Sequence, residues 1–123
     1  MVQESKEQFQ KIFGAAGEQV LKRIAKYSPR LVGHIYDYIA GDVYQDQTLD
    51  IRTRELCVIS CLAAQGGLTE QVGVHIRTAL RNGVKQEEIV SAIEAVGAYA
   101  GVPKALNALF TAIQVFEEST SLK

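Results

Sequence analysis

The sequence predicts an all-α protein, a bundle of about six helices in one domain that spans residues 1–123. Apolar residues recur at helical spacing along most of the chain, and no segment shows a credible strand pattern. The breaks between the periodic segments carry residues that start or end helices, such as Ser, Pro, Asn and Gly. Because 47% of the 123 residues are apolar, the chain can bury a sizeable core, which excludes disordered and mini-protein classes.

The balance of charge excludes several classes of partner. Thirteen basic and fourteen acidic residues give a net charge of -1, which provides no large field for binding a polyanion, so no nucleic acid is expected as a partner. Residues 1–10 lack the apolar stretch of a secretory signal, and no run approaches the roughly 18 apolar residues of a membrane span. We therefore expect a cytoplasmic protein with no membrane partner.

The first two predicted helices form a packing pair. Residues 4–26 have an amphipathic pattern, although Gly14 and Gly17 weaken its continuity. Ser28 and Pro29 are the residue types of an N-cap and a first helical position, and they open a shorter helix that stops near Gly41. The apolar positions expected on the inner face of the first helix are Phe9, Phe13, Ala16, Val20, Ile24 and Tyr27.

The segment after the polar connector of residues 42–48 is expected to be the central helix. Asp50 has the residue type of its N-cap, and Gly66 and Gly67 end it. Residues 56–64 are apolar or small on every side of this helix. That pattern is typical of a helix surrounded by protein.

Three further helices complete the predicted bundle. Thr69 is expected to cap the fourth helix, which Asn82 and Gly83 end through a left-handed cap. Residues 85–88 start the fifth helix with acids in its first turn, where the helix dipole favours them. Residues 101–103 then break the chain before a last helix that ends in a polar tail.

Glu55 and His75 are the first candidates for chemistry. They are twenty residues apart across the short Gly-Gly turn, so two adjacent antiparallel helices can bring both side chains toward one pocket. A carboxylate that orients an imidazole is the minimum apparatus of general acid/base catalysis. The alternative is a solvated acid and a packing histidine. His34, on the second helix, is interpreted as a surface or packing residue.

Arg52, Arg54 and Tyr99 are candidates for binding a substrate. Guanidinium groups recognise carboxylates through paired hydrogen bonds, so either arginine can hold an acidic substrate. The alternatives are two solvated arginines, or an ion pair of Arg52 with Glu55, which lies three residues away on the same face. Tyr99 is expected either to form a pocket wall or to be only a packing residue.

Cys57 and Cys61 are interpreted as reduced core thiols. They lie four apart within the apolar central helix. Side chains at this spacing have Cβ atoms about 5–6 Å apart, whereas a disulfide needs roughly 3.5–4.5 Å. Gly66 and Gly67 do not form a phosphate loop, because no strand precedes them, and no metal-ligand spacing is present. No cofactor or metal is therefore implied.

Nineteen residues between Asp50 and Pro103 occur in an order and at a spacing that resemble the carboxymuconolactone decarboxylase family. The family-like core is expected to span about residues 42–118. The resemblance implies a family-like helical core in this range. The residues that carry it are Asp50, Arg52, Arg54, Glu55, Leu56, Ala63, Ala64, Gly66, His75, Ala79, Leu80, Gly83, Glu87, Glu88, Ile89, Tyr99, Ala100, Gly101 and Pro103.

The resemblance implies a cofactor-independent lyase that releases carbon dioxide from a small carboxylated organic acid. Its type substrate is γ-carboxymuconolactone, in the β-ketoadipate route of aromatic catabolism. The family's site is lined by a histidine and an acid, which match His75 and Glu55. In this assignment His75 delivers a proton, Glu55 orients it, and Arg52 or Arg54 binds the substrate carboxylate. The family also implies a homo-oligomer, a trimer or hexamer.

Two alternatives remain. The first is a thiol peroxidase or disulfide reductase of the alkylhydroperoxidase-like branch, with peroxiredoxin-type activity. In that branch a Cys-x-x-Cys motif precedes the histidine by four residues, but Leu68 and Gln71 occupy those positions here. Cys57 and Cys61 are the only cysteines left for such a role. The second alternative is a helical assembly protein without catalytic activity.

Overall fold

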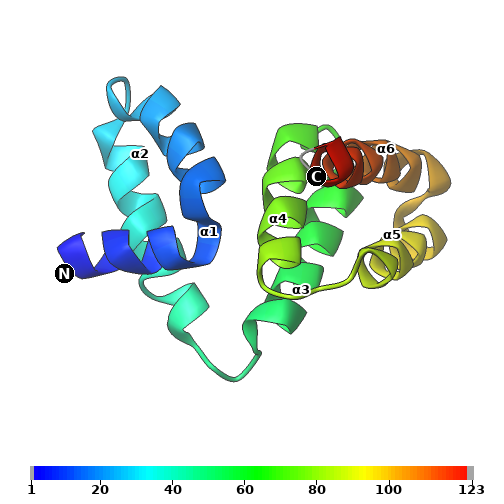
Figure 1. The fold of residues 1–123 in the computed structure, drawn as a ribbon, viewed down its shortest axis with the longest axis horizontal. Helices are drawn as coiled ribbons and strands as arrows, with labels where there is room; N and C mark the ends of the chain where they lie inside the picture. The colour runs from blue at the N-terminus through cyan, green and yellow to red at the C-terminus, as the bar shows by residue number, and fades with distance from the viewer. Residues whose placement is uncertain (1, 122–123) are drawn as a thin grey trace. The chain divides into compact units, whose positions relative to one another are not determined.

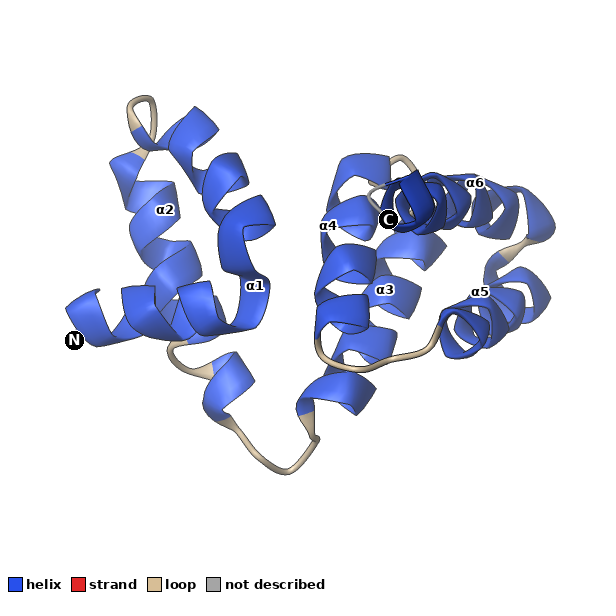
Figure 2. Cartoon of the chain, viewed as in Figure 1, coloured by secondary structure: helices blue, strands red, loops and turns tan. Residues whose placement is uncertain are grey.

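The computed structural model describes residues 2–121, which are helical with no strand among them (Figure 2). The predicted all-α class with six main helices is confirmed. The described residues form two compact units, which meet in the sequence between Asp50 and Ile51. The single domain over residues 1–123, with a family-like core at about 42–118, stays a prediction.

The first helix of the N-terminal unit is α1, Val2–Ala25, and it is kinked at Gly14. Gly14 has φ 64° and ψ -156°, a conformation that glycine tolerates because it lacks a Cβ. The buried residues Phe9, Phe13, Gly17 and Leu21 follow one another at intervals of four, so the same face of α1 points inward on both sides of the kink. Among the predicted inner positions, Ala16 and Tyr27 are exposed. The predicted inner face is therefore confirmed at Phe9 and Phe13, only half-buried at Val20 and Ile24, and wrong at Ala16 and Tyr27.

The second half of this unit begins as predicted. Ser28 caps α2, Pro29–His34, by accepting a hydrogen bond of 3.2 Å from the backbone N–H of Leu31. The helix continues as the π-helical segment η1, Ile35–Ala40, and stops at Gly41. A short 3₁₀ turn, η2, follows at Val43–Gln45. The helix from residue 29 to residue 40 agrees with the predicted extent.

Aromatic side chains form the core of the N-terminal unit. The Phe9 ring packs against Phe13 and Tyr36 with centroid distances of 4.6 Å and 5.4 Å, and Phe13 contacts Tyr44 at 5.3 Å. His34 is exposed and stacks on Tyr38, with ring centroids 5.3 Å apart. Its predicted place on the surface is confirmed.

The C-terminal unit contains four helices that pack pairwise around one core (Figure 1). Helix α3, Ile51–Gln65, packs beside α4, Thr69–Arg81, and α5, Gln86–Ala100, packs beside α6, Val102–Ser121. The predicted polar tail extends past Ser121, where residues 122 and 123 lie outside the described part of the chain. The buried core residues are Ile59, Ala63, Val72, Ile76, Ala79, Val84, Ile89, Ile93, Val96, Ala108, Ala112 and Val115.

The turns between these helices use the residues that the sequence indicates. Gly66 and Gly67, with φ of 77° and 74°, reverse the chain between α3 and α4. After α4, the N–H of Val84 bonds to the carbonyl of Ala79 at 3.0 Å, which closes the helix over Gly83. The predicted cap at Thr69 is wrong, because Thr69 is the first helical residue and the N-cap position is Leu68, which makes no side-chain cap bond.

Helix α3 is less enclosed than its sequence predicts. Helices α4, α5 and α6 all pack on it, but they cover only part of its circumference. Its buried residues are Glu55, Ile59 and Ala63, which share one side. Apolar residues on every side predict that other helices pack all around α3. They do not show whether those helices belong to the same chain.

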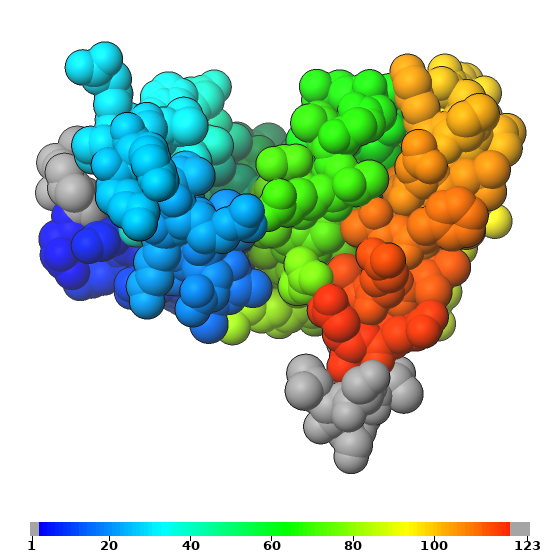
Figure 3. All heavy atoms as spheres, turned by 90° about the horizontal axis from the view of Figure 1, so that it is seen from above, coloured from blue at the N-terminus to red at the C-terminus, as the bar shows by residue number. Residues whose placement is uncertain are grey.

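Helix α6 lies at the surface of the C-terminal unit along much of its length, as the orange and red atoms of Figure 3 show. It exposes an apolar stripe, Val102, Leu106, Phe110 and Ile113, whose spacing places all four on one helix face. No helix among residues 2–121 is long and apolar enough to cross a membrane.

Candidate functional site

Glu55 and His75 meet in the structure, as the sequence predicts. Glu55 is on the first turns of α3, and the short glycine turn brings α4 back beside it with His75 facing the same side. The Nδ1 atom of His75 lies 2.8 Å from Oε1 of Glu55. Glu55 is fully buried, whereas 18% of the His75 side chain is exposed.

This geometry defines which ring nitrogen can exchange a proton. An ionised carboxylate only accepts hydrogen bonds, so beside an ionised Glu55 it is the His75 tautomer with its proton on Nδ1 that makes this bond. Nε2 is then the ring atom that accepts or delivers a proton. The hydrogen bond to the buried carboxylate fixes the orientation of the His75 ring. The pair is therefore arranged for general acid/base chemistry.

Arg52 forms an ion pair with a residue that the sequence did not predict as its partner. Its Nη2 atom lies 2.7 Å from Oε1 of Glu88 on α5, so its ion pair is with Glu88 rather than with Glu55. The same oxygen accepts the backbone N–H of Lys85 at 2.9 Å. The hydrogen bond from Lys85, and then the nearby Arg52 guanidinium, lower the pKa of Glu88. Arg52 thus ties the start of α3 to the start of α5, across 36 residues of sequence.

The other two predicted substrate-binding residues differ from each other. Arg54 is half-buried and precedes Glu55 in the first turn of α3, so it remains a candidate. Tyr99 is 94% exposed near the end of α5. Its side chain is not packed within the C-terminal unit, which corrects the interpretation of Tyr99 as a packing residue, and its place in a pocket wall stays a prediction.

Cys57 and Cys61 are both exposed, which corrects the prediction that they are core thiols. They lie on the side of α3 that its neighbouring helices leave uncovered. Residues two apart on a helix differ by about 200° in direction, so Cys57 faces away from the buried Glu55. Their spacing argument still holds, because both cysteines lie within one uninterrupted α-helix.

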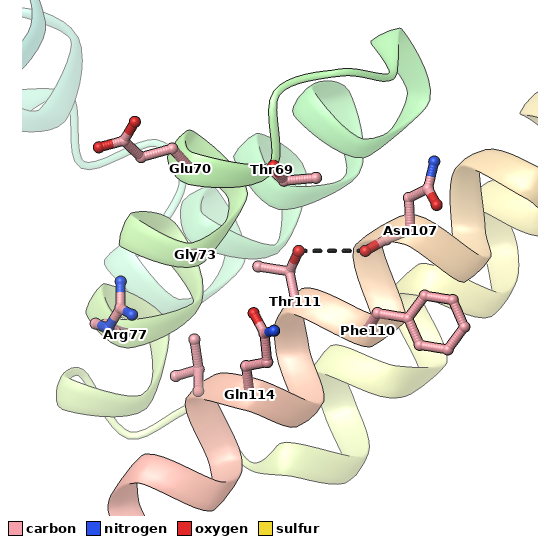
Figure 4. A pocket seen from close by; sticks show the side chains of 9 residues that line it. Thr69, Glu70, Gly73, Arg77, Asn107, Phe110, Thr111 and Gln114 are labelled. Carbon is pink, nitrogen blue, oxygen red and sulfur yellow. Dashed lines mark hydrogen bonds between the residues drawn. The ribbon is translucent and has the colours of Figure 1, made fainter.

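A groove of about 550 Å³ opens between α4 and α6 (Figure 4). Neither Glu55 nor His75 lines this groove, and neither lines the two smaller cavities that the described part of the C-terminal unit has beside Gly66 and beside Val90. The sequence did not predict this groove. The signal that could have indicated it is the spacing of Asn107, Thr111 and Gln114, which places three polar residues on one face of the last helix. Its lining residues are Thr69, Glu70, Gly73 and Arg77 of α4, and Asn107, Phe110, Thr111, Gln114 and Val115 of α6.

The geometry defines the chain as a small helical protein with a buried carboxylate–histidine pair. A family model described as "Carboxymuconolactone decarboxylase family" matches residues 29–114, which is more than half of the chain. The chain therefore belongs to the carboxymuconolactone decarboxylase family. The matched range contains the Glu55–His75 pair and extends into both compact units.

Three relatives have recognisable sequence similarity. The chain is 28% identical over 98 residues to 4-carboxymuconolactone decarboxylase of Acinetobacter baylyi, an alignment that covers 80% of this chain and 72% of the relative. It is 28% identical over 99 residues to an uncharacterized 15.0 kDa protein of Paracoccus denitrificans, covering 80% and 74%. It is 32% identical over 75 residues to nitrosuccinic acid decarboxylase of Metarhizium robertsii, covering 61% and 52%.

Proposed function

We propose that this protein is a carboxy-lyase that releases carbon dioxide from a small carboxylated acid, with His75 as its acid/base group. The observation that carries the proposal is the 2.8 Å hydrogen bond between the His75 ring and the fully buried Glu55. Family membership supports it, as do two relatives whose names describe decarboxylases. A buried carboxylate behind a partly exposed imidazole suits the transfer of a proton.

The reaction needs little beyond proton delivery and charge stabilisation. The bond between the substrate carbon and its carboxylate breaks, and the bonding electron pair passes into an electron-accepting group of the substrate. Carbon dioxide leaves, and the resulting carbanion equivalent takes a proton from Nε2 of His75. Glu55 holds the ring and balances its positive charge before that proton leaves.

The substrate class follows from the same chemistry. The names of the two decarboxylase relatives describe a carboxylated lactone and a carboxylated nitro compound. Each compound combines a carboxylate with a group that can accept the electron pair. We propose this combination as the substrate class. The finer form of the proposal is γ-carboxymuconolactone, in the β-ketoadipate route of aromatic catabolism.

We assign the binding of the substrate carboxylate to Arg54. It lies one residue before Glu55 and is half-buried, so it is close to the pair in sequence and partly withdrawn from water. A guanidinium forms strong, directional hydrogen bonds to a carboxylate. Arg52, the other predicted candidate, is exposed and forms an ion pair with Glu88.

A substrate panel tests the proposal directly. Purified protein would be incubated with 4-carboxymuconolactone, nitrosuccinate and a plain dicarboxylate such as succinate, and carbon dioxide release would be measured. We expect release from at least one of the first two compounds and none from succinate, which has no adequate electron acceptor. No release from either activated acid would refute the decarboxylase proposal. Arg54→Gln should raise KM more than it lowers kcat.

A thiol peroxidase is the second candidate function, because Cys57 and Cys61 are exposed. In this scheme a thiolate attacks the O–O bond of a hydroperoxide, giving a sulfenic acid and an alcohol. A small-molecule thiol then condenses with the sulfenic acid, which forms a mixed disulfide and releases water. A second small-molecule thiol attacks the mixed disulfide, releases the cysteine thiol and leaves as a small disulfide. Peroxide turnover that is lost on alkylation with iodoacetamide would support this function, and turnover that survives alkylation would exclude it.

We also propose that the protein works as a homo-oligomer, such as a trimer or hexamer. The apolar stripe on α6 and the exposed Tyr99 leave large hydrophobic side chains in contact with water. Contiguous exposed apolar surface of this kind marks interaction sites on small domains. A second copy of the chain is the simplest cover for it.

A further inference from the structure

The groove between α4 and α6 lies on a different side of α4 from the proposed catalytic pair. Gly73 lines the groove and His75 contacts Glu55 of α3, and residues two apart on a helix point about 200° apart. The groove's volume, about 550 Å³, is within the usual range of small-molecule sites, roughly 300–1,000 Å³. It is therefore a second place where a ligand can bind.

Gly73 lets α4 approach Thr111 of α6 closely where the two helices line the groove. A Cβ at this position would lie 3.4 Å from Nη1 of Arg77 and 3.4 Å from Cγ2 of Thr111. Alanine would only just fit at such distances, and any larger side chain would project between the two helices. Because Gly73 is inside a helix, where glycine costs about 1 kcal/mol relative to alanine, its lack of a side chain is not explained by helix formation.

Arg77 provides a fixed hydrogen-bond donor at one end of the groove. Its Nε and Nη2 atoms bind the two carboxylate oxygens of Glu118 at 3.1 Å and 2.9 Å. This paired contact holds the guanidinium in place, and Nη1 is the nitrogen that lies nearest Gly73. The hydrogen bonds from Arg77 also lower the pKa of Glu118, so the acid stays ionised and balances the guanidinium charge.

The rest of the interior is polar and neutral. The Thr111 hydroxyl donates to the backbone carbonyl of Asn107 at 3.2 Å, which leaves its oxygen oriented as an acceptor. Side-chain amides of Asn107 and Gln114 add donors and acceptors. Figure 4 shows that Glu70 extends from α4 away from α6, so its carboxylate does not point into the groove. Val115 adds an apolar wall, and Phe110 lies at the edge of the groove, where its ring extends away from α4 and belongs to the apolar stripe of α6.

From this arrangement we propose that the groove between α4 and α6 binds a small, uncharged, polyhydroxylated molecule such as a sugar or polyol. Such a ligand matches a wall of neutral donors and acceptors, with its C–H faces against the apolar side chains. A carboxylate is a poor match, because Glu118 already neutralises Arg77. This separates the groove's ligand from the acid proposed as the substrate at His75. The inference does not depend on the proposed decarboxylase activity.

The test is a titration of the full chain, followed by two-dimensional ¹⁵N–¹H NMR. The probes are D-glucose, D-ribose and D-glucuronate, the last matched to glucose but negatively charged. We expect saturable shifts in residues 69–77 and 107–115 with at least one neutral sugar, and weaker binding of glucuronate than of glucose. Gln114→Leu should weaken sugar binding by at least about tenfold, a change of about 1.4 kcal/mol.

Two glycine variants give a matched comparison. Gly73→Leu fills the groove and should abolish binding, whereas Gly33→Leu places the same side chain at a position in α2 with open space around it and should not. If Gly73→Leu does not fold, Gln114→Leu alone decides. The proposal is overturned if no neutral sugar gives saturable shifts, if glucuronate binds more tightly than glucose, or if Gln114→Leu has no effect. Groove resonances that shift only with protein concentration also overturn it, because a second copy would then fill the groove.

Discussion

The hydrogen bond between Glu55 and His75 should couple their contributions to stability. Glu55 is fully buried and lies 2.8 Å from the ring. Removing one partner of a buried polar pair leaves the other without its hydrogen bond, at a cost of about 1–3 kcal/mol. Replacing both partners by apolar groups costs less than the sum of the single changes. We therefore expect His75→Ala and Glu55→Leu each to be destabilising, with a coupling energy of about 1.5–3 kcal/mol.

The assay is urea unfolding of the parent, the two single variants and the double variant, followed by far-ultraviolet circular dichroism. Protomer concentration is held constant, because oligomers unfold in a concentration-dependent way. A parallel cycle on the exposed pair Arg52 and Glu88 is the control and should give smaller coupling. A Glu55–His75 coupling within about 0.5 kcal/mol of zero would show that the buried bond does not form in solution.

Three further predictions concern the exposed parts of the chain. The pKa of Glu88 is lowered in the folded state, so its contribution to folding stability is present above the ordinary value of 4.5 and is lost as pH falls through the folded pKa. Amide hydrogen exchange at the start of α5 should therefore accelerate in that acidic range, and the acceleration should be smaller in Arg52→Ala. Cys57 and Cys61 should both react with a thiol reagent in the folded protein, and replacing both with Ser should change the urea midpoint little; two unreactive thiols would contradict their exposure. Leu106→Asp, within the apolar stripe of α6, should reduce the molar mass measured by light scattering, and an unchanged oligomer would place the interface elsewhere.

Local sequence signals were sufficient for most of the fold. Ser28 and Pro29 started a helix, and the glycine pair at 66 and 67 reversed the chain, because these residues act through their own backbone geometry. The meeting of Glu55 and His75 also followed from the sequence, since two helices joined by so short a turn must lie side by side.

The wrong predictions share a physical cause, which is that they depend on the surroundings of a helix rather than on its own residues. Cys57 lies in an apolar segment, but which side of α3 is covered depends on where the other helices pack. Leu21 is buried because α2 and η1 pack against α1, and the pattern of α1 alone does not show which residues they cover. The partner of Arg52 is 36 residues away, beyond the reach of a local pattern.

The groove was missed for a related reason. From the sequence alone, Gly73 indicates only a weak position in a helix. Its structural role depends on Thr111 of α6, which lies opposite it. The sequence likewise indicates only that Gln114 is an exposed amide, because it does not show that α4 lies across from it. A cavity belongs to two elements at once, so no periodicity within one element predicts it.

The turnover of His75→Gln tests the proposed mechanism most directly. The measurement is kcat for carbon dioxide release from 4-carboxymuconolactone, or from whichever panel acid the parent decarboxylates, with folding checked by circular dichroism. If His75 delivers the proton, kcat should fall by about 100- to 10,000-fold, the usual contribution of a positioned acid or base. Glu55→Gln, which keeps a hydrogen-bonding side chain but removes the charge, should lower kcat less. A folded His75→Gln variant with near-normal turnover would show that the pair is not the catalytic centre.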